Sequence, residues 1–154
     1  MRTVDRIRIR APFARVFAAA SSVSRWPEIL PHYRWVRTLE RGASGALVEM
    51  AAWRPFGPLR WPTWWVSEMT VDSQARQIRY RHVRGITAGM DVVWRLASGP
   101  SSVAIELEHR WSGPAWPLIG SVAAGAVIGP VFVHGIASRT LAGLARAAER
   151  IPKP

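Results

Sequence analysis

The chain has 154 residues, a length that fits one domain and leaves little room for a second. Hydrophobic residues make up 49% and charged residues 20%, a balance that is typical of a globular protein and excludes a disordered chain. Because cysteine is absent, disulfide scaffolds, cysteine-ligated zinc, iron–sulfur clusters and thiol catalysis are excluded as well.

The protein is strongly basic. The formal net charge is +11, from 21 basic and 10 acidic residues, and Lys153 is the single lysine. The arginines are scattered one by one, which is typical of a solvated surface. A GC-rich genome explains such an excess of arginine, and attraction to phosphate or to an anionic membrane is the functional alternative. Nucleic-acid binding is not indicated.

The chain begins with one predicted strand and two short predicted helices. Residues 3–10 alternate apolar and charged side chains, as a half-buried strand does. Pro12 suits the first position of a helix, and Phe13, Val16 and Phe17 follow at helical spacing. A second short helix is predicted over residues 23–30, where Pro31 ends it.

Six further strands are predicted, because the period of the apolar residues changes to two. Short turns separate the strands, so we expect each to pair with its neighbour in an antiparallel meander. Residues 54–58, Arg-Pro-Phe-Gly-Pro, are expected to form a loop. The predicted strands cover residues 33–41, 46–53, 61–71, 76–83, 90–96 and 103–111.

The chain ends in a predicted long helix over residues 131–150. Ile136, Leu141 and Leu144 lie on one apolar stripe of this helix, and arginines occupy the opposite side. Strands followed by a helix indicate an α+β fold, in which the helix covers one face of a seven-stranded antiparallel sheet.

The stretch of residues 115–133 contains no charged residue. A membrane span needs about 20 mainly apolar residues, but proline and glycine interrupt this stretch repeatedly. We expect a loop and a small helix here. An interfacial or homodimer-forming segment is the alternative, and a transmembrane helix ranks last. No apolar leader follows Met1, so the expected location is cytoplasmic, with a peripheral membrane position as the alternative.

Strand alternation places large aromatic and histidine side chains on the inner face of the predicted sheet. Buried indole and imidazole groups need hydrogen-bond partners, and a ligand cavity with a few polar groups provides them. An ordinary tryptophan-rich core is the alternative interpretation. The inward residues of the last three strands are Tyr80, His82, Met90, Trp94, His109 and Trp111.

Known motifs for metal, nucleotide or hydrolytic chemistry are absent from the sequence. The four histidines lack metal-ligand spacing, the glycines form no nucleotide fingerprint, and no serine occupies a strand-to-helix elbow. We therefore predict neither a metal site nor a cofactor.

The order of the elements resembles the helix-grip fold of the START/Bet v 1-like (SRPBCC) superfamily. The similarity covers nearly all of a single domain, residues 1–154, apart from the apolar insert at about 113–130. The chain looks closest to the polyketide cyclase/dehydrase branch, which includes bacterial aromatase/cyclases. The matching motifs are Ile9-Arg-Ala-Pro12, Ser24-Arg-Trp-Pro27, Trp65-Val-Ser-Glu68, Asp91-Val-Val-Trp94 and Arg139-Thr-Leu141.

The resemblance implies a mostly apolar cavity between the sheet and the long helix. Such a cavity would accept a hydrophobic or polycyclic molecule, such as a polyketide, an isoprenoid or a lipid. Trp26, Tyr33, Trp65 and Ser67 match positions that line the cavity in the family. With the inward-facing residues, the candidate cavity set is Trp26, Tyr33, Trp35, Trp53, Trp65, Ser67, Met69, Tyr80, His82, Met90, Trp94, His109 and Trp111.

Met69 departs from the pattern of the cyclases, which carry an arginine directly after the Trp-Val-Ser-Glu stretch. A thioether donates no hydrogen bond, so the departure favours binding of a ligand over its turnover. Arg37 is the candidate replacement, because it shares a predicted face with Tyr33.

Three hypotheses follow from these observations. The first is a binding protein for a hydrophobic ligand. The second is a polyketide cyclase/dehydratase with Tyr33 as general acid and His82 or His109 as base. The third is a lipid-binding module that works at a membrane surface or on quinone carriers.

Overall fold

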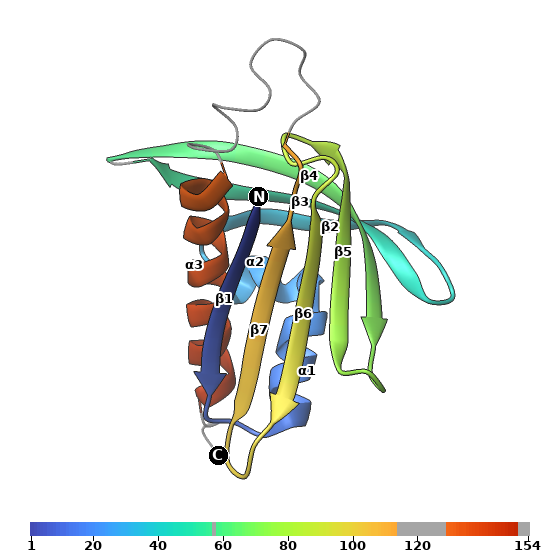
Figure 1. Ribbon diagram of the computed structural model, residues 1–154, viewed down its shortest axis with the longest axis vertical. Helices are drawn as coiled ribbons and strands as arrows, with labels where there is room; N and C mark the ends of the chain where they lie inside the picture. Colours follow the sequence, from blue (N-terminus) through green and yellow to red (C-terminus); the bar gives the residue numbers. More distant parts are fainter. Residues whose placement is uncertain (57, 114–128, 151–154) are drawn as a thin grey trace.

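In the computed structural model, an antiparallel sheet curls around one long helix (Figure 1). The structure describes residues 1–56, 58–113 and 129–150. The sheet has seven strands in the order β1-β7-β6-β5-β4-β3-β2. The strands are β1 (Arg2–Ile9), β2 (Tyr33–Arg41), β3 (Gly45–Phe56), β4 (Leu59–Asp72), β5 (Gln77–Gly85), β6 (Asp91–Ser98) and β7 (Val103–Arg110).

The helices lie at two places in the chain. Helix α1 (Phe13–Ser21), the 3-10 turn η1 (Val23–Arg25) and helix α2 (Trp26–Ile29) connect β1 to β2, and α3 (Gly129–Glu149) follows β7. Helix α3 runs beside β1 in Figure 1. The predicted helix-grip fold, with its two short helices and its meander of strands, is confirmed.

Strands β3 and β4 are longer than the sequence predicts. They continue through most of the expected loop, and Pro55 pairs with Arg60 near the end of the hairpin. Strand β2 pairs with β3 only as far as Ala52. Pro55 therefore lies where β3 has a neighbour on one side alone, a position in which a missing N–H is tolerated.

A β-bulge in β2 changes which side chains face the helix. Tyr33 pairs with Ala52 but Trp35 pairs with Ala51, so the register shifts at Arg34. Because strand side chains alternate between faces, this extra residue moves Trp35 to the face opposite Tyr33. The expectation that Trp35 faces the cavity is thus corrected.

The same shift moves Arg37 to the outer face. Its guanidinium lies 3.7 Å from the carboxylate of Glu49 and 5.4 Å from the centroid of the Trp35 ring. About two-thirds of its side chain is exposed. Arg37 does not replace the arginine that cyclases carry at the position of Met69.

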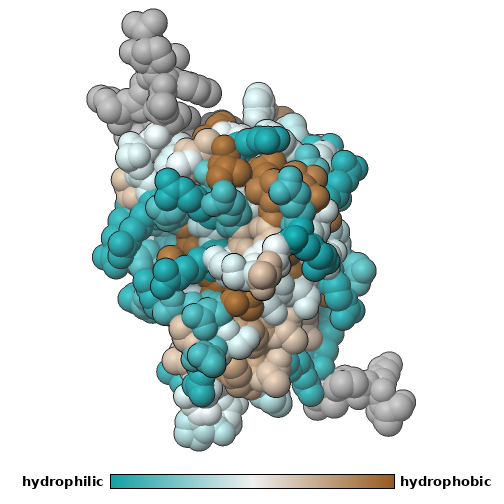
Figure 2. Space-filling view, turned by 90° about the vertical axis from the view of Figure 1, so that its right-hand side faces the viewer, coloured by the Kyte–Doolittle hydropathy of each residue, from teal (hydrophilic) through white to brown (hydrophobic). Residues whose placement is uncertain are grey.

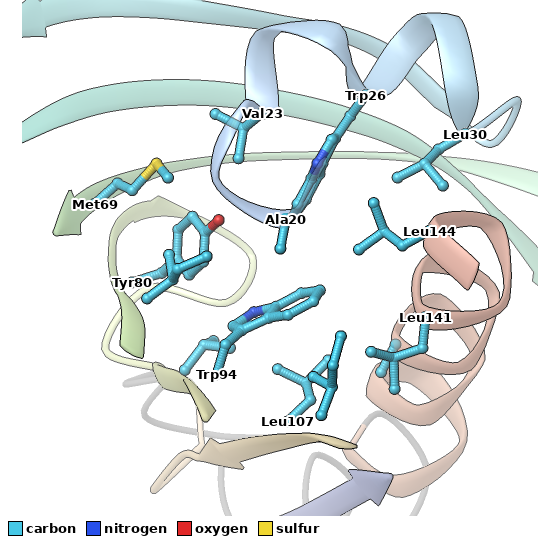
Figure 3. Close-up of a cluster of buried hydrophobic side chains, with 14 of the residues drawn as sticks. Ala20, Val23, Trp26, Leu30, Met69, Tyr80, Trp94, Leu107, Leu141 and Leu144 are labelled. Carbon is cyan, nitrogen blue, oxygen red and sulfur yellow. The ribbon is translucent and has the colours of Figure 1, made fainter. Parts of the chain in front are cut away.

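The hydrophobic core lies between the inner face of the sheet and the helices (Figure 3). Leu30, which follows α2, is fully buried and lies beside Leu144 of α3. Trp94 of β6 and Leu107 of β7 complete the sheet side of the cluster. This packing holds α2 and α3 together and defines one end of the space between helix and sheet.

The uncharged stretch of residues 115–133 lies mostly outside the described residues. Its predicted roles, as a loop with a small helix or as an interfacial or dimer-forming segment, stay predictions. Among the helices that the structure describes, none has the length and apolarity to cross a membrane.

Candidate functional site

A cavity of about 80 Å³ lies between the inner face of the sheet and α3. Strands β2 to β7, helices α2 and α3, and the loop between β5 and β6 all contribute to its walls, which are mainly apolar and aromatic. The lining residues are Trp26, Tyr33, Met50, Arg54, Thr63, Trp65, Tyr80, His82, Ile86, Thr87, Met90, Val92, Trp94, Leu107, His109, Val133, Ile136, Ala137 and Thr140.

Most of the candidate residues from the sequence line this cavity. The structure brings together eight of them from α2 and five different strands: Trp26, Tyr33, Trp65, Tyr80, His82, Met90, Trp94 and His109. Met90 lies in the loop directly before β6. Alternation along the strands is the reason that these side chains meet.

Five candidates lie elsewhere, and Trp35 is one of them because of the bulge. Trp53 lies on the outer face, where the guanidinium of Arg34 is 4.6 Å from its ring centroid. Ser67 and Met69 are buried, but the cavity does not reach them. Trp111 is buried too, and its indole N–H donates to the carbonyl of Ala88, which fastens the loop between β5 and β6.

Aromatic rings form a continuous wall on one side of the cavity. Trp26 lies 5.1 Å from Tyr33 and 5.9 Å from Trp94, measured between ring centroids. Tyr33 lies 6.2 Å from Trp65, which stacks on His82 at 5.8 Å. Offset and edge-on contacts of this kind hold aromatic side chains in fixed orientations, so the wall presents a preformed aromatic surface.

The two histidines of the cavity are neutral at neutral pH. Burial, together with the neighbouring His109, lowers the pKa of His82 to about 3. Burial lowers the pKa of His109 to about 4. The Nδ1 atom of His82 lies 2.6 Å from the hydroxyl of Thr87, which orients the ring. Groups with such low pKa values are weak general bases.

The two tyrosines of the cavity are neutral hydrogen-bonding groups. Burial raises the pKa of both Tyr33 and Tyr80. Tyr33 is hydrogen-bonded to Thr140 of α3, which in turn lies 3.1 Å from the Nε2 atom of His32. Tyr80 differs, because its hydroxyl points into the buried cluster in Figure 3 and has no hydrogen-bond partner in the described part of the chain.

A second polar atom of the wall lacks a partner. The Nδ1 atom of His109 is buried and makes no hydrogen bond within the described residues. Buried polar atoms are nearly always hydrogen-bonded in folded proteins. Tyr80 and His109 therefore each have a hydrogen-bonding atom that the described residues leave unused.

Arg54 is the charged residue of the described cavity lining that the sequence analysis missed. It lies on β3 and is 4% exposed, and burial lowers its pKa to about 8. The sequence places it in a loop, because Pro55 and Gly57 suggest that the strand has ended. The signal that identifies it is the period of two through Val48, Met50 and Ala52, which are all buried.

The described residues contain no group of three or more histidine, aspartate or glutamate side chains that would hold a metal ion. The described residues that line the cavity supply aromatic surfaces, neutral hydrogen-bonding groups and one guanidinium.

A curled antiparallel sheet that encloses a cavity against a long C-terminal helix defines a helix-grip protein. The model of one family, described as polyketide cyclase / dehydrase and lipid transport, matches residues 9–132. The chain belongs to this family. No curated protein sequence matches it.

Several solved structures share the fold at low sequence identity. The Zhui aromatase/cyclase from Streptomyces sp. R1128 is 19% identical, with a TM-score of 0.82 over 97% of this chain and 94% of that one. Norcoclaurine synthase from Thalictrum flavum is 12% identical, with a TM-score of 0.68 over 96% of this chain and 85% of that one. Major latex-like protein 151 from Panax ginseng is 8% identical, with a TM-score of 0.75 over 97% of this chain and 98% of that one.

Proposed function

We propose that this protein binds a hydrophobic small molecule in the cavity between the sheet and α3. The observation that carries the proposal is an aromatic-walled cavity lined by Tyr80 and His109, each of which has a buried polar atom without a hydrogen-bond partner among the described residues. Ligand sites combine apolar walls with a few polar groups in this way. The apolar walls would supply affinity, and the two polar atoms would orient the ligand.

The size of the cavity favours a compact ligand. A cavity that holds one benzene ring measures about 150 Å³, and ordinary ligand pockets measure roughly 300–1,000 Å³. At about 80 Å³, this cavity admits a single ring only when flexible side chains turn. Met50 and Met90 line it, and methionine adapts its shape readily. A polyketide, an isoprenoid or another polycyclic molecule needs a larger rearrangement of the walls.

Native mass spectrometry of the purified protein tests the proposal, because a bound molecule appears as a defined added mass. Ala137 of α3 is buried and lines the cavity. The Ala137→Leu variant fills part of the space, so we expect it to lose the adduct. Ala142, on the same helix, is partly exposed and does not line the cavity. Its Ala142→Leu variant is the matched control and should keep the adduct.

If the purified protein carries no adduct, calorimetric titration with indole measures binding to the same three proteins. Binding to the wild type and to Ala142→Leu, with loss in Ala137→Leu, supports the proposal. Equal binding of the added or native ligand to all three proteins would place it outside this cavity and contradict the proposal.

Cyclase/dehydratase activity is the second candidate, because Tyr33, His82 and His109 come from three strands and line one cavity. The hydroxyl of Tyr33 would donate to a carbonyl oxygen, and a neutral histidine would accept a proton from the carbon beside it. The raised pKa of Tyr33 and the lowered pKa values of the histidines make all three weak in these roles, so binding is the first proposal.

An assay with a poly-β-ketone thioester as substrate tests this second candidate. Mass spectrometry measures whether the substrate loses water. The combined variant Tyr33→Phe, His82→Gln and His109→Gln should abolish a reaction that the wild type catalyses. Turnover that survives the three substitutions would eliminate the mechanism.

A further inference from the structure

The end of the β3–β4 hairpin stands apart from the rest of the sheet. Strand β2 pairs with β3 only as far as Ala52, and β5 pairs with β4 only from Trp65 onward. Residues 53–55 and 58–64 form a hairpin end, whose two strands pair only with each other in the described sheet. At its base, the backbone N–H of Trp53 also donates to the carbonyl of His32. In Figure 1 this two-stranded hairpin end projects past α3, near the start of that helix.

Large apolar side chains of the hairpin end are exposed to solvent. Leu59 is 66% and Trp61 is 62% exposed, and they lie two residues apart on one face of β4. Trp64 is 39% exposed and lies on the opposite face of the same strand. Exposed apolar side chains that gather at one place mark an interaction site, whereas single ones scattered over a surface need no explanation.

Arginines accompany these side chains, and acidic residues are missing from the sequence around them. Between Glu49 and Glu68 the sequence contains no aspartate or glutamate. Arg60 is exposed, and its guanidinium lies 5.9 Å from the ring centroid of Trp53. The exposed guanidinium of Arg34 lies 4.6 Å from the same centroid. The hairpin end therefore combines exposed apolar surface with positive charge.

We propose that the hairpin end docks on the surface of an anionic lipid bilayer. Tryptophan favours the boundary between acyl chains and water, because its ring is apolar and its N–H is a hydrogen-bond donor. Arginine is attracted to the anionic headgroups at the same boundary. The outer backbone edges of the two strands need water, so the hairpin end stays in the headgroup layer and does not cross the hydrocarbon core.

Docking in this position places one wall of the cavity next to the bilayer. Thr63 lines the cavity, and it lies on the same face of β4 as Trp61, two residues along the strand. The inference goes beyond the proposed function and does not depend on it, because the docking surface consists of exposed side chains and the ligand site of buried ones.

Co-sedimentation with vesicles tests the inference. The wild type should bind vesicles of phosphatidylglycerol and phosphatidylcholine in equal parts, and it should bind phosphatidylcholine vesicles more weakly. Leu59→Ser combined with Trp61→Ser should weaken binding to the mixed vesicles at least about tenfold, because burial of one large apolar side chain contributes about 1.5–3 kcal/mol. Leu39→Ser combined with Val71→Ser is the matched control. It removes two exposed apolar side chains at the other end of the β2–β3–β4 part of the sheet and should bind like the wild type.

A charge variant separates the contribution of the arginines from that of the apolar side chains. Arg60→Gln should weaken binding to the mixed vesicles about fivefold, because a basic residue close to an anionic bilayer contributes about 1 kcal/mol. Its binding to phosphatidylcholine vesicles should not change. Arg79→Gln removes an exposed arginine of β5 that pairs with Thr70, far from the hairpin end, and should bind like the wild type.

Fluorescence quenching by nitroxide-labelled lipids measures the depth of Trp61 in the bilayer. Trp61→Phe keeps an aromatic ring, so it should bind like the wild type, and the difference in quenching between the two proteins reports on Trp61. A nitroxide close to the headgroup should quench this difference more strongly than one at the end of the acyl chain. Equal quenching in the two bound proteins would mean that Trp61 does not contact the bilayer, and it would overturn the inference.

Two further outcomes would contradict the proposal. Failure of the wild type to bind the mixed vesicles at low salt, or full binding by the Leu59→Ser, Trp61→Ser variant, would overturn it. Sedimentation velocity examines a second copy of the chain as the occupant. A wild-type dimer that the same double variant converts to a monomer would assign the hairpin end to self-association and would overturn the inference as well. The proposed ligand site stands in each of these cases.

Discussion

Glu108 has the most heavily paired carboxylate among the described residues. It lies on the outer face of β7, 2% exposed, with the guanidinium nitrogens of Arg2, Arg110 and Arg95 at 2.6, 2.7 and 2.9 Å. Hydrogen bonds from Arg2 and Arg110 are the largest causes that lower its pKa to about 2. The group joins the three strands β1, β7 and β6, since each supplies one of these residues.

We predict that Glu108→Gln lowers the free energy of unfolding by about 1–2 kcal/mol at pH 7, because three arginines lose a shared anion. The arginine side chains are 40–64% exposed, and solvent screening keeps the effect at this size. Urea denaturation of the variant and the wild type measures it. Glu68→Gln, at an exposed carboxylate on β4, is the control and should change little.

The effect of Glu108 depends on pH in a defined direction. Its folded-state pKa of about 2 lies below the ordinary 4.5, so the stabilisation is complete above pH 4.5 and is lost as the pH falls toward 2. The difference between Glu108→Gln and the wild type should therefore shrink between pH 4.5 and pH 2.5. A difference that stays constant over this range would contradict the assignment.

At the scale of elements, α3 contains two glycines in different surroundings. A Cβ atom on Gly143 would lie 2.2 Å from Cδ2 of Leu30, so this glycine permits the close approach of the segment after α2. A Cβ atom on Gly135 would meet no atom of the other described residues within 4 Å. Both glycines weaken the helix to the same intrinsic degree, and only Gly143 has a packing reason.

We predict opposite effects for the two alanine substitutions. Gly143→Ala should destabilise the protein by about 1–3 kcal/mol, because the fully buried side chain of Leu30 must shift to make room for the added methyl group. Gly135→Ala should stabilise it by about 0.5–1 kcal/mol through helix propensity alone. Thermal or urea denaturation compares the pair. A stabilising Gly143→Ala would show that α2 and α3 are not in tight contact.

At the scale of the whole molecule, the positive charge is spread over the surface. Hydrophilic side chains interleave with smaller hydrophobic groups over the face in Figure 2. Several arginines form cross-strand ion pairs, such as Arg6 with Glu106 at 2.8 Å and Arg81 with Asp91 at 3.6 Å. Exposed pairs of this kind contribute little stability, and they agree with the solvated surface that the scattered arginines predict.

Acid sensitivity is expected of the whole fold, because His82 and His109 are buried in a neutral form. Their folded-state pKa values of about 3 and 4 lie below the ordinary 6.5, so the unfolded chain binds more protons between these values. Stability should be complete above about pH 6.5 and fall as the pH drops to 4, by up to about 1.4 kcal/mol per pH unit for each histidine.

Urea denaturation from pH 7 to pH 4 measures this dependence. The double variant His82→Gln and His109→Gln should show a clearly shallower slope than the wild type. Parallel pH profiles for the two proteins would mean that the histidines are not the groups that take up protons on unfolding.

Much of the fold and part of the site were predictable from local patterns. The cavity is lined by Tyr80, His82, Trp94 and His109. Their positions were predictable because side chains alternate between the two faces along each of their strands. Trp35 and Arg54 were not predictable in the same way. A bulge at Arg34 and a strand that passes through Pro55 are set by pairing with neighbouring strands, and such pairing leaves little trace in the local sequence.

The amino-acid sequence by itself determined the strands, the long helix and their order, since the spacing of apolar residues is a local property that selects one secondary structure over another. Only the tertiary structure decided that Arg54, rather than Arg37, is the arginine among the described residues that line the cavity. The physical reason is that a side chain's face depends on strand register, which long-range hydrogen bonds establish as the sheet closes around α3.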